Sequence, residues 1–338
     1  MAAPIGVGVI GSGFMGSTWC RVTASQVPEA RLVAVGGGRG VPGLAAELSI
    51  EQLDLDAQLA RPDIGIVILA TPPKGHLAQV EAAAAAGKHV LVEKPMALVA
   101  SEAEAMVAAC DRAGVRLGVV SQHRFRAAPT AARKLIDEGR IGAIRMIRVF
   151  GPGSGWDIPL DSWNSNAANV TPYIDWGAHA CDLVRWLTGS EPVLAFGQYA
   201  SYQDIGPVGQ SAMAQYTMAN GVMVQIWLTY ELPQPGLGSA MQLLITGSQG
   251  VIDLDSYGVV RLQSADGWQT IFEQPPFDPL DLTSQVRFQA YAAELRDLIA
   301  AVHERRDPWV SGREGAATTR MLEAAERSAR LGESVRIG

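Results

Sequence analysis

The chain has 338 residues, a length that favours two domains over one. It carries 27 basic and 34 acidic side chains, for a formal net charge of −7, and its residues are 48% hydrophobic and 18% charged. The acidic balance argues against a dedicated nucleic-acid-binding protein, and the hydrophobic fraction excludes disorder of the whole chain.

Cysteine content and the apolar runs indicate the compartment. Cys20, Cys110 and Cys181 stand far apart with no CxxC pair, a pattern that fits a reducing environment better than a disulfide framework. The first residues lack the basic stretch of a signal peptide, and no apolar run approaches the ~18 residues of a membrane span. We therefore expect a cytoplasmic protein without a membrane segment.

Apolar runs rich in valine and isoleucine alternate with helix-like segments through the first third of the chain. Uninterrupted apolar strands alternating with helices are typical of a parallel sheet that is covered on both faces. The pattern predicts an α/β Rossmann domain with a doubly wound parallel sheet over residues 1–121. We expect strands at 5–10, 31–35, 64–70, 89–92 and 115–120, and helices at 13–25, 43–48, 75–86 and 101–113.

The pattern changes after residue 121. In 222–230, four apolar residues alternate with Met223, Gln225, Trp227 and Thr229, and this period of two predicts a strand with one buried face. The second domain, 122–338, is therefore expected to be α+β with a large, mostly antiparallel sheet. Strands are expected at 144–150, 193–200, 211–218, 222–230, 240–246 and 251–253, and helices at 129–138, 175–187, 283–303 and 312–331; the last is a candidate to pack back on the first domain.

A glycine-rich turn follows the first expected strand: Gly11-Ser12-Gly13-Phe14-Met15-Gly16. In a GxGxxG turn between a strand and a helix, the first glycine permits the tight turn, the second lets the backbone approach a pyrophosphate, and the third allows close helix packing. The helix N-terminus then offers free N–H groups to the phosphates. The turn predicts a dinucleotide cofactor.

The end of the second strand indicates which cofactor. Val35 is followed by Gly36, Gly37, Gly38 and Arg39, with no carboxylate to bind ribose hydroxyls. An arginine at this place attracts a 2′-phosphate, so we favour NADP and keep NAD as the alternative; the other interpretation makes Arg39 a solvated loop residue.

Four further segments share a pattern with one family. They are Thr71-Pro72 followed by His76; Gly87-Lys88-His89-Val90 with Glu93-Lys94-Pro95; 122–142; and 175–189, DWGAHACDLVRWLTG. These segments closely resemble the Gfo/Idh/MocA oxidoreductases (glucose–fructose oxidoreductase, inositol dehydrogenase and relatives). The residues 287–298 resemble a helix of the inositol dehydrogenase-like members, so the resemblance covers nearly the whole chain.

The resemblance implies a catalytic trio of Lys94, Asp175 and His179. The chemistry of these residue types agrees with it. Asp175 and His179 are four residues apart and share a face if the segment is helical, a histidine can take a proton near neutral pH, and a lysine ammonium stabilises a developing alkoxide. Helix-surface stabilisation by an Asp–His pair is the structural alternative.

Other residues are expected around the cofactor and the substrate. Asp182 completes the second motif and could be structural. Thr71, Pro72, His76, Glu93, Lys94 and Gln122 are expected to join the glycines at the cofactor. Arg124, Trp163, Asn164 and Tyr291 are expected at the substrate with the trio.

The segment before Asp175 departs from the family pattern, because residues 164–173 are asparagine-rich where many members are glycine-rich. Its amides could bind a polyol or simply form turns. Trp156, Trp163, Tyr230 and Tyr291 could form an apolar wall or pack in the core. The five histidines show no metal-ligand spacing, and we expect no metal.

We interpret the sequence as an NAD(P)-dependent dehydrogenase acting on a secondary alcohol of a sugar, an inositol-like polyol or a related cyclic diol, or reducing the ketone. One alternative is a dihydrodiol or hydroxymuconate-semialdehyde dehydrogenase of aromatic catabolism. Another is a non-catalytic NAD(P)-sensing regulator, and a third is an oxidoreductase that keeps its nicotinamide between two substrates. Family resemblance and the second apolar face of the sheet predict a homodimer or homotetramer through the C-terminal sheet.

Overall fold

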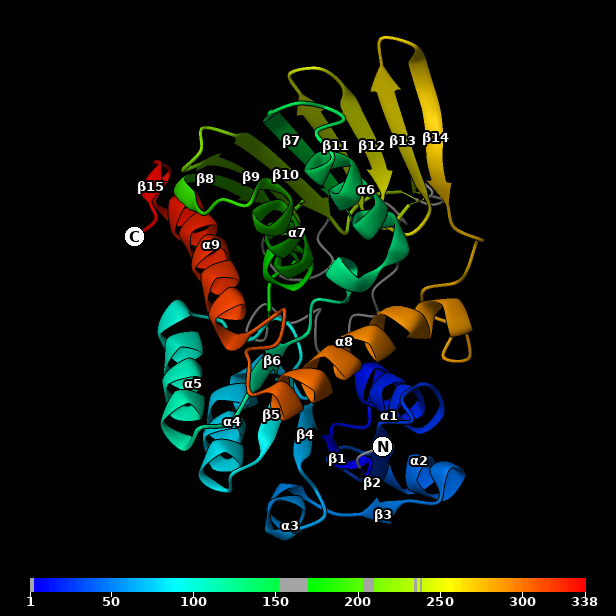
Figure 1. The fold of residues 1–338 in the computed structure, drawn as a ribbon. Coiled ribbons are helices and arrows are strands. Elements are labelled where there is room, and N and C mark those ends of the chain that lie inside the picture. Colours follow the sequence, from blue (N-terminus) through cyan, green and yellow to red (C-terminus); the bar gives the residue numbers. More distant parts are fainter. Residues whose placement is uncertain (1–2, 152–169, 203–209, 234–235, 238) are drawn as a thin grey trace. The chain divides into compact units, whose positions relative to one another are not determined.

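The computed structural model describes residues 3–151, 170–202, 210–233, 236–237 and 239–338. Their contacts divide the chain into two units, each with its own sheet (Figure 1). The first unit comprises Met1–Gln122 with Phe277–Ala316, and the second comprises His123–Pro276 with Ala317–Gly338.

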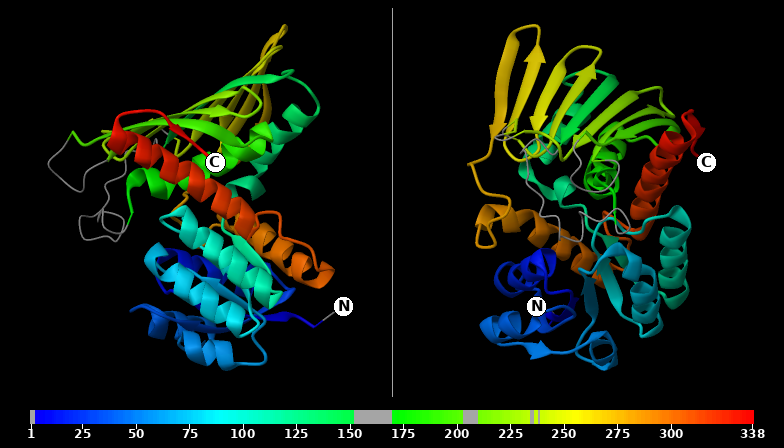
Figure 2. Two further views of the ribbon diagram at one scale, coloured as in Figure 1. Left: turned by 90° about the vertical axis from the view of Figure 1, so that its left-hand side faces the viewer. Right: turned by 180° about the vertical axis from the view of Figure 1, so that it is seen from behind.

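The first unit contains a six-stranded sheet in the order β3-β2-β1-β4-β5-β6, with every strand pair parallel. Side chains of the central strands are fully buried because helices cover both faces (Figures 1 and 2). This confirms the predicted doubly wound domain. The strands are β1 (Ile5–Ile10), β2 (Ala30–Gly36), β3 (Glu51–Gln52), β4 (Ile66–Leu69), β5 (His89–Val92) and β6 (Leu117–Val119); the helices are α1 (Phe14–Gln26), α2 (Val41–Leu48), α3 (Leu55–Ala60), α4 (His76–Ala85) and α5 (Ala100–Ala113).

A helix from the end of the chain belongs to this first unit. Helix α8 (Gln285–Glu304) buries Phe288, Leu295 and Leu298 in the core that α1 and the parallel sheet share. The ring of Tyr291 meets Trp19 of α1 edge to face at 5.3 Å. The division therefore differs from the expected second domain of 122–338, because 277–316 packs with the first unit.

The second unit contains a nine-stranded sheet in the order β14-β13-β12-β11-β7-β10-β9-β8-β15. Neighbours are antiparallel except β7 and β10, which confirms the mostly antiparallel sheet. β13, β14 and the short β15 were not predicted. The strands are β7 (Ile144–Gly151), β8 (Pro192–Ala200), β9 (Ser211–Met218), β10 (Met223–Thr229), β11 (Gln242–Gly247), β12 (Val251–Asp255), β13 (Val259–Ser264), β14 (Gly267–Glu273) and β15 (Val335–Arg336).

Helices cover one face of this sheet. α6 (Ala127–Asp137) packs on β12 to β14, and α7 (Pro172–Thr188) packs on β7, β9 and β10 (Figure 1). The second part of α9 (Gly312–Leu331) lies beside α7, where Leu322 contacts Gly177. The period of two in β10 is confirmed, since Val224 and Leu228 are buried while Met223 is 56% exposed on the opposite face.

Membrane insertion of a helix finds no support in the described part of the chain. None of its helices is both long enough and apolar enough to cross a bilayer.

Candidate active site

The glycine turn lies at the carboxyl end of β1, with β2 on one side and β4 on the other. Crossovers therefore leave β1 and β4 in opposite directions, and in such sheets ligands bind outside the carboxyl ends of the strands at this switch point. Thr71 follows β4 and Lys94 follows β5. The predicted cofactor residues of the first unit thus gather along one edge of its sheet.

The three motif glycines have different surroundings. Gly11 has φ +119°, and a Cβ there would lie 2.2 Å from the carbonyl oxygen of Ala70. A Cβ on Gly16 would lie 2.0 Å from the carbonyl oxygen of Gly11, so α1 starts in contact with the turn. A Cβ on Gly13 would meet nothing within 4 Å in the described structure. Packing therefore requires glycine at positions 11 and 16, whereas Gly13 leaves open space above the backbone.

That open space lies at the N-terminus of α1. Gly13 is the N-cap residue, no side chain caps the helix, and its first turn contains no acidic residue. The N–H groups of a 13-residue helix therefore face space that a side chain does not fill. This arrangement fits the pyrophosphate of a dinucleotide, which the N–H groups and the helix dipole would hold.

The loop after β2 packs against this turn. A Cβ on Gly38 would lie 2.7 Å from Oγ of Ser12, and the N–H of Gly40 donates to the same Oγ at 3.1 Å. Gly37 and Gly38 have φ of +74° and +92°, a region that favours glycine. Arg39 projects from this loop as an exposed side chain, and within the described residues it forms no ion pair.

Residues after β4 are held by local hydrogen bonds. The Thr71 hydroxyl donates to Oε1 of Gln79 at 2.6 Å. The ring nitrogens of the buried His76 lie 2.8 Å from the carbonyl oxygen of Thr71 and 3.1 Å from that of Met96, and burial lowers the pKa of this imidazole. His76 therefore ties the ends of two strands together; Pro72, next to Thr71, is exposed.

Residues after β5 carry the Glu-Lys-Pro motif. The carboxylate of Glu93 is buried and accepts hydrogen bonds from the indole N–H of Trp19 at 2.7 Å and from the N–H of Lys94 at 3.1 Å. Lys94 is partly exposed and precedes a cis peptide bond to Pro95. Glu93 thus fixes the backbone that carries Lys94. Both of these hydrogen bonds of Glu93 are made to residues of the first unit.

Gln122 ends the first unit. Its side chain is buried, and its Oε1 has no hydrogen-bond partner among the described residues. A buried amide oxygen without a donor is costly, so a donor from a ligand would suit it. This observation fits the predicted place of Gln122 at the cofactor.

In the second unit, α7 presents the predicted acid–base pair. The hydroxyl of Thr171 caps the helix by accepting the N–H of Ile174 at 3.2 Å. Asp175 and His179 follow one turn apart and are each 5% exposed. Between them, a Cβ on Gly177 would lie 2.9 Å from a methyl of Leu322, which explains the glycine of the motif.

Tyr230, just after β10, contacts this pair. Its hydroxyl donates to Oδ2 of Asp175 at 2.9 Å. Burial, with the Asp175 charge nearby, raises the pKa of Tyr230 well above its usual range, so this phenol stays protonated and remains a donor. From the sequence, Tyr230 was expected in an apolar wall or in the core, and its bond to Asp175 had no signal there.

His179 lies against two aromatic rings that include a residue the sequence analysis missed. Its ring centroid is 4.6 Å from that of His123 and 5.8 Å from that of Trp176. His123 is completely buried, and the hydroxyl of Tyr257 lies 3.3 Å from its Nε2. His123 lies 56 positions from His179 and 134 from Tyr257, so no local pattern announced these two contacts.

Arg124 and Asp182 form a buried ion pair. Nε and Nη2 of Arg124 donate to the two carboxylate oxygens of Asp182 at 2.8 and 2.6 Å, and both side chains are at most 5% exposed. The two-point geometry is that of a strong arginine–carboxylate pair. It anchors the short η2 segment (Gln122–Phe125) to α7 and favours a structural role for Asp182; a substrate contact of Arg124 stays a prediction.

The remaining substrate candidates stay predictions. Trp163 and Asn164, with Trp156 and most of the asparagine-rich segment, lie outside the described residues. Tyr291 belongs to the first unit, where it is 4% exposed and packs against Trp19 and the guanidinium of Arg287. Its surroundings are those of a core residue.

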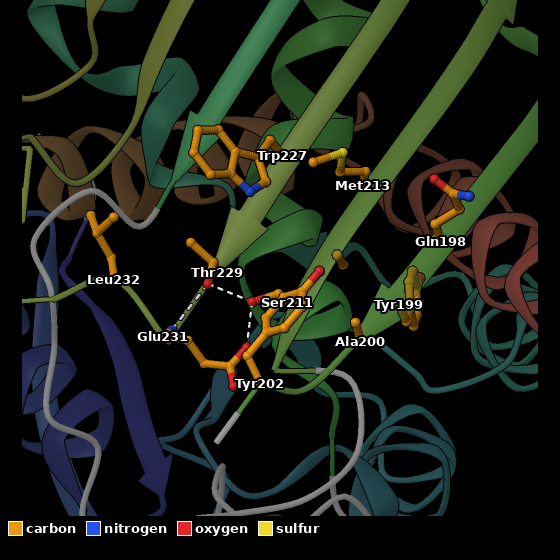
Figure 3. Close-up of a pocket in the computed structure, with 11 residues that line it drawn as sticks. Gln198, Tyr199, Ala200, Tyr202, Ser211, Met213, Trp227, Thr229, Glu231 and Leu232 are labelled. Carbon is orange, nitrogen blue, oxygen red and sulfur yellow. Dashed lines mark hydrogen bonds between the residues drawn. The ribbon is translucent and has the colours of Figure 1, made fainter. Parts of the chain in front are cut away.

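A hollow of about 550 Å³ occurs elsewhere in the second unit, on the sheet at β8 to β10 (Figure 3). Trp227, Met213 and Gln198 line it, together with a hydrogen-bonded group in which Ser211 contacts Thr229 and Glu231. The described residues that line this hollow include none of the predicted site residues. The described residues also hold no group of three or more histidine, cysteine or acidic side chains suited to a metal.

Family models match both parts of the chain. Residues 5–121 match the model described as an oxidoreductase family with an NAD-binding Rossmann fold, and residues 130–253 match the GFO/IDH/MocA C-terminal domain. By its fold and its glycine turn, the chain therefore belongs to the class of oxidoreductases with an NAD-binding Rossmann domain.

Individual relatives match over nearly the full length. The D-apiose dehydrogenase of Paraburkholderia graminis is 31% identical over 94% of this chain and 82% of its own, and the inositol 2-dehydrogenase of Rhizobium meliloti is 26% identical over 95% and 96%. An oxidoreductase domain protein from Kribbella flavida, 26% identical, superposes over 100% of both chains with a TM-score of 0.87. The chain belongs to the Gfo/Idh/MocA oxidoreductases, which confirms the resemblance seen in its motifs.

Proposed function

We propose that this protein is an NAD(P)-dependent dehydrogenase that oxidises a secondary alcohol of a sugar or inositol-like polyol, or reduces the corresponding ketone. The observation that carries the proposal is the buried Asp175 and His179 on one helix, in a chain whose first unit has the open glycine turn. The names of the two relatives, an apiose and an inositol dehydrogenase, support the substrate class.

Each side chain of the trio has a separate task in this proposal. When bound, the nicotinamide supplies the hydride acceptor in oxidation and the donor in reduction. His179 takes the hydroxyl proton of the alcohol, and Asp175 stabilises the imidazolium that forms. Lys94 donates a hydrogen bond to the substrate oxygen and stabilises its developing negative charge. In reduction the same groups return the proton.

Turnover tests this assignment. The purified protein would be incubated with NAD⁺ or NADP⁺ and a panel of inositols, pentoses and hexoses, together with an aromatic-derived cis-dihydrodiol for the alternative of aromatic catabolism. We expect polyol or sugar oxidation, with kcat reduced about 10²- to 10⁴-fold in His179→Ala and cofactor affinity kept. Cofactor binding without turnover of any substrate class would instead favour the NAD(P)-sensing regulator.

We further propose NADP as the preferred cofactor. The exposed guanidinium of Arg39 next to the glycine turn, with no carboxylate at the end of β2, supports a 2′-phosphate contact. Titration of NADPH and NADH against tryptophan fluorescence should give tighter NADPH binding, and Arg39→Ala should weaken NADPH about tenfold while NADH changes little. Tighter binding of NADH by the unsubstituted protein would reject this preference.

A homodimer or homotetramer through the nine-stranded sheet completes the proposal. Its support is the face opposite α6 and α7, where Met146, Met213, Met223 and Leu244 are 43–56% exposed. Apolar side chains gathered on one face are typical of a protein–protein interface. We also propose a cytoplasmic location, because the three cysteines are free thiols.

A further inference from the structure

Of the two described aromatic rings that contact His179, the proposed base, His123 is the nearer. The two imidazole centroids lie 4.6 Å apart with planes inclined by 47°. His123 is 0% exposed and His179 is 5% exposed, so water is largely excluded from both rings. The indole of Trp176, on the same helix, meets His179 edge to face at 5.8 Å. The imidazole of His179 therefore lies against two described aromatic rings.

His123 is itself held from a distant part of the chain. Tyr257, in the turn between β12 and β13, places its hydroxyl 3.3 Å from Nε2 of His123, and the two rings meet nearly at right angles with centroids 5.3 Å apart. The guanidinium of Arg126 lies 4.2 Å above the ring of Tyr257, within the range of a cation–π contact. The N–H of Tyr257 donates to the carboxylate of Asp255 at 2.9 Å.

We propose that His123, oriented by Tyr257, is a positioning residue for His179: it fixes the plane of the catalytic imidazole and keeps one of its faces dry. The inference rests on the proposed function, in which His179 is the acid–base group. A rigid neighbour lowers the cost of presenting one ring nitrogen to the substrate hydroxyl. Exclusion of water disfavours the charged imidazolium and so favours the basic form.

Among the described residues, the charged and titratable groups near the two rings come from four segments of the second unit: α7, the segment 123–126, the end of β10 and the turn between β12 and β13. Asp175 and Asp182 lie on α7, and the Asp182 carboxylate is paired with Arg124. Tyr230 donates to Asp175. The other groups are Arg126 and Tyr257 beside His123. His123→Ala and His123→Phe both leave these groups in place and both remove the imidazole of His123 itself, so a difference between the two variants reports hydration and ring freedom at His179.

The sign of the expected pH effect follows from hydration. In His123→Ala water can reach the face of His179 that the His123 ring covers, and hydration favours the imidazolium. Oxidation needs the neutral imidazole, so the acidic limb of the kcat/KM profile should move to higher pH. His123→Phe keeps a ring in the same place and should leave the limb nearly unchanged.

A readout without substrate separates this inference from the proposed function. The chain has five histidines, so the imidazoles of ¹⁵N-histidine-labelled protein can be titrated individually by NMR. We expect the His179 signal of His123→Ala to titrate at higher pH with a mixed tautomer population, and that of His123→Phe to match the unsubstituted protein. An unchanged His179 titration in His123→Ala overturns the inference whether or not a substrate has been found.

Kinetics with the accepted substrate form the second arm. We expect kcat to fall about 10- to 100-fold in His123→Ala, and to recover to within about threefold in His123→Phe, which keeps the ring contact with Tyr257. Tyr257→Ala, which removes that ring contact, should reduce kcat, with cofactor affinity unchanged throughout. His303→Ala, at an exposed position of α8, is the matched control. Equal loss in the alanine and phenylalanine variants, with an unshifted pH profile, would show that aromatic packing on His179 is not what matters.

Discussion

At the scale of single residues, the motif glycines separate cofactor binding from packing. Gly16 touches the backbone of Gly11, whereas the position above Gly13 is open. Gly13 and Gly16 both belong to the GxGxxG pattern of dinucleotide-binding turns, but each is needed there for a different physical reason. The sequence motif alone does not reveal which glycine tolerates a methyl group in the free protein.

Gly13→Ala should therefore lose the cofactor and keep the fold. Its φ of −75° suits alanine, so the melting temperature should change by little, while the new methyl group stands where the pyrophosphate would approach and weakens NAD(P)H by tenfold or more. In Gly16→Ala the added methyl group would overlap the backbone of Gly11, and the free energy of unfolding should fall by about 1–3 kcal/mol. Thermal melts and fluorescence titrations of both variants check this, and equal stability of the two would contradict it.

His76 makes stability depend on pH. Burial lowers its pKa below 6.5 in the folded chain, so the unfolded chain binds the proton more tightly. Its contribution is therefore complete above about pH 6.5 and declines as the pH falls below that value, with a limiting slope of about 1.4 kcal/mol per pH unit.

We expect His76→Gln, which lacks the titrating ring, to flatten the loss of unfolding free energy between pH 6.5 and 5. Urea melts across this range would show it. His89, whose pKa burial also lowers, is present in both proteins and provides the common background. A variant with the same slope as the unsubstituted chain would assign the acid sensitivity elsewhere.

At the scale of elements, α7 is fixed at several points along its length. Thr171 caps its start and also donates to Glu326 of α9 at 2.8 Å. Gly177 allows the close approach of Leu322. The Arg124–Asp182 pair ties the helix to the segment that carries His123. The residues that hold the acid–base pair are therefore spread over three elements.

Breaking the buried ion pair between Arg124 and Asp182 should lower the stability of the fold more than it lowers catalytic activity. Asp182→Ala leaves the Arg124 guanidinium buried without its carboxylate and should cost about 3–5 kcal/mol, whereas Arg124→Met with Asp182→Leu should restore most of that stability. Chemical denaturation of the two variants measures the difference. If the double variant is stable but its KM for substrate rises sharply, the predicted substrate contact of Arg124 gains support.

At the scale of the whole molecule, the sheet of the second unit has one face packed on helices and one face open to solvent. Met146 and Met223 are directly opposite each other on neighbouring strands and are 50% and 56% exposed. The hollow in Figure 3 lies beside the same strands. An interface on this face would bury both features.

Met146→Glu combined with Met223→Glu should convert the proposed oligomer to a smaller species. Two carboxylates among the exposed methionines would carry a desolvation cost in the interface, while the half-exposed side chains leave the core unaffected. Light scattering after size-exclusion chromatography measures the mass. Leu331→Glu, at a 54% exposed apolar position at the end of α9, is the control, and an unchanged mass in the double variant would place the interface elsewhere.

Prediction from the sequence succeeded where the signal was local. Strands β1 and β9 and helix α9 were predicted with the observed bounds, and α7 was predicted except for its first turn. β14 was missed because most of its side chains are exposed, so no buried face imposed a period; β13 was missed although Val260 and Leu262 form a buried face. The packing of α8 with the first unit was missed because an amphipathic helix sequence shows which face is buried but not which of two cores buries it.

The sequence by itself determined the family, the parallel and mostly antiparallel sheets, the glycine turn and the residue types for acid–base chemistry. These depend on short spacings that a helix or strand converts directly into one face or one turn. Only the tertiary structure decided that Arg124 pairs with Asp182, that Tyr230 binds Asp175 and that the ring of His123 lies against that of His179. Such contacts join segments far apart in the chain, and their geometry is set by how whole elements pack.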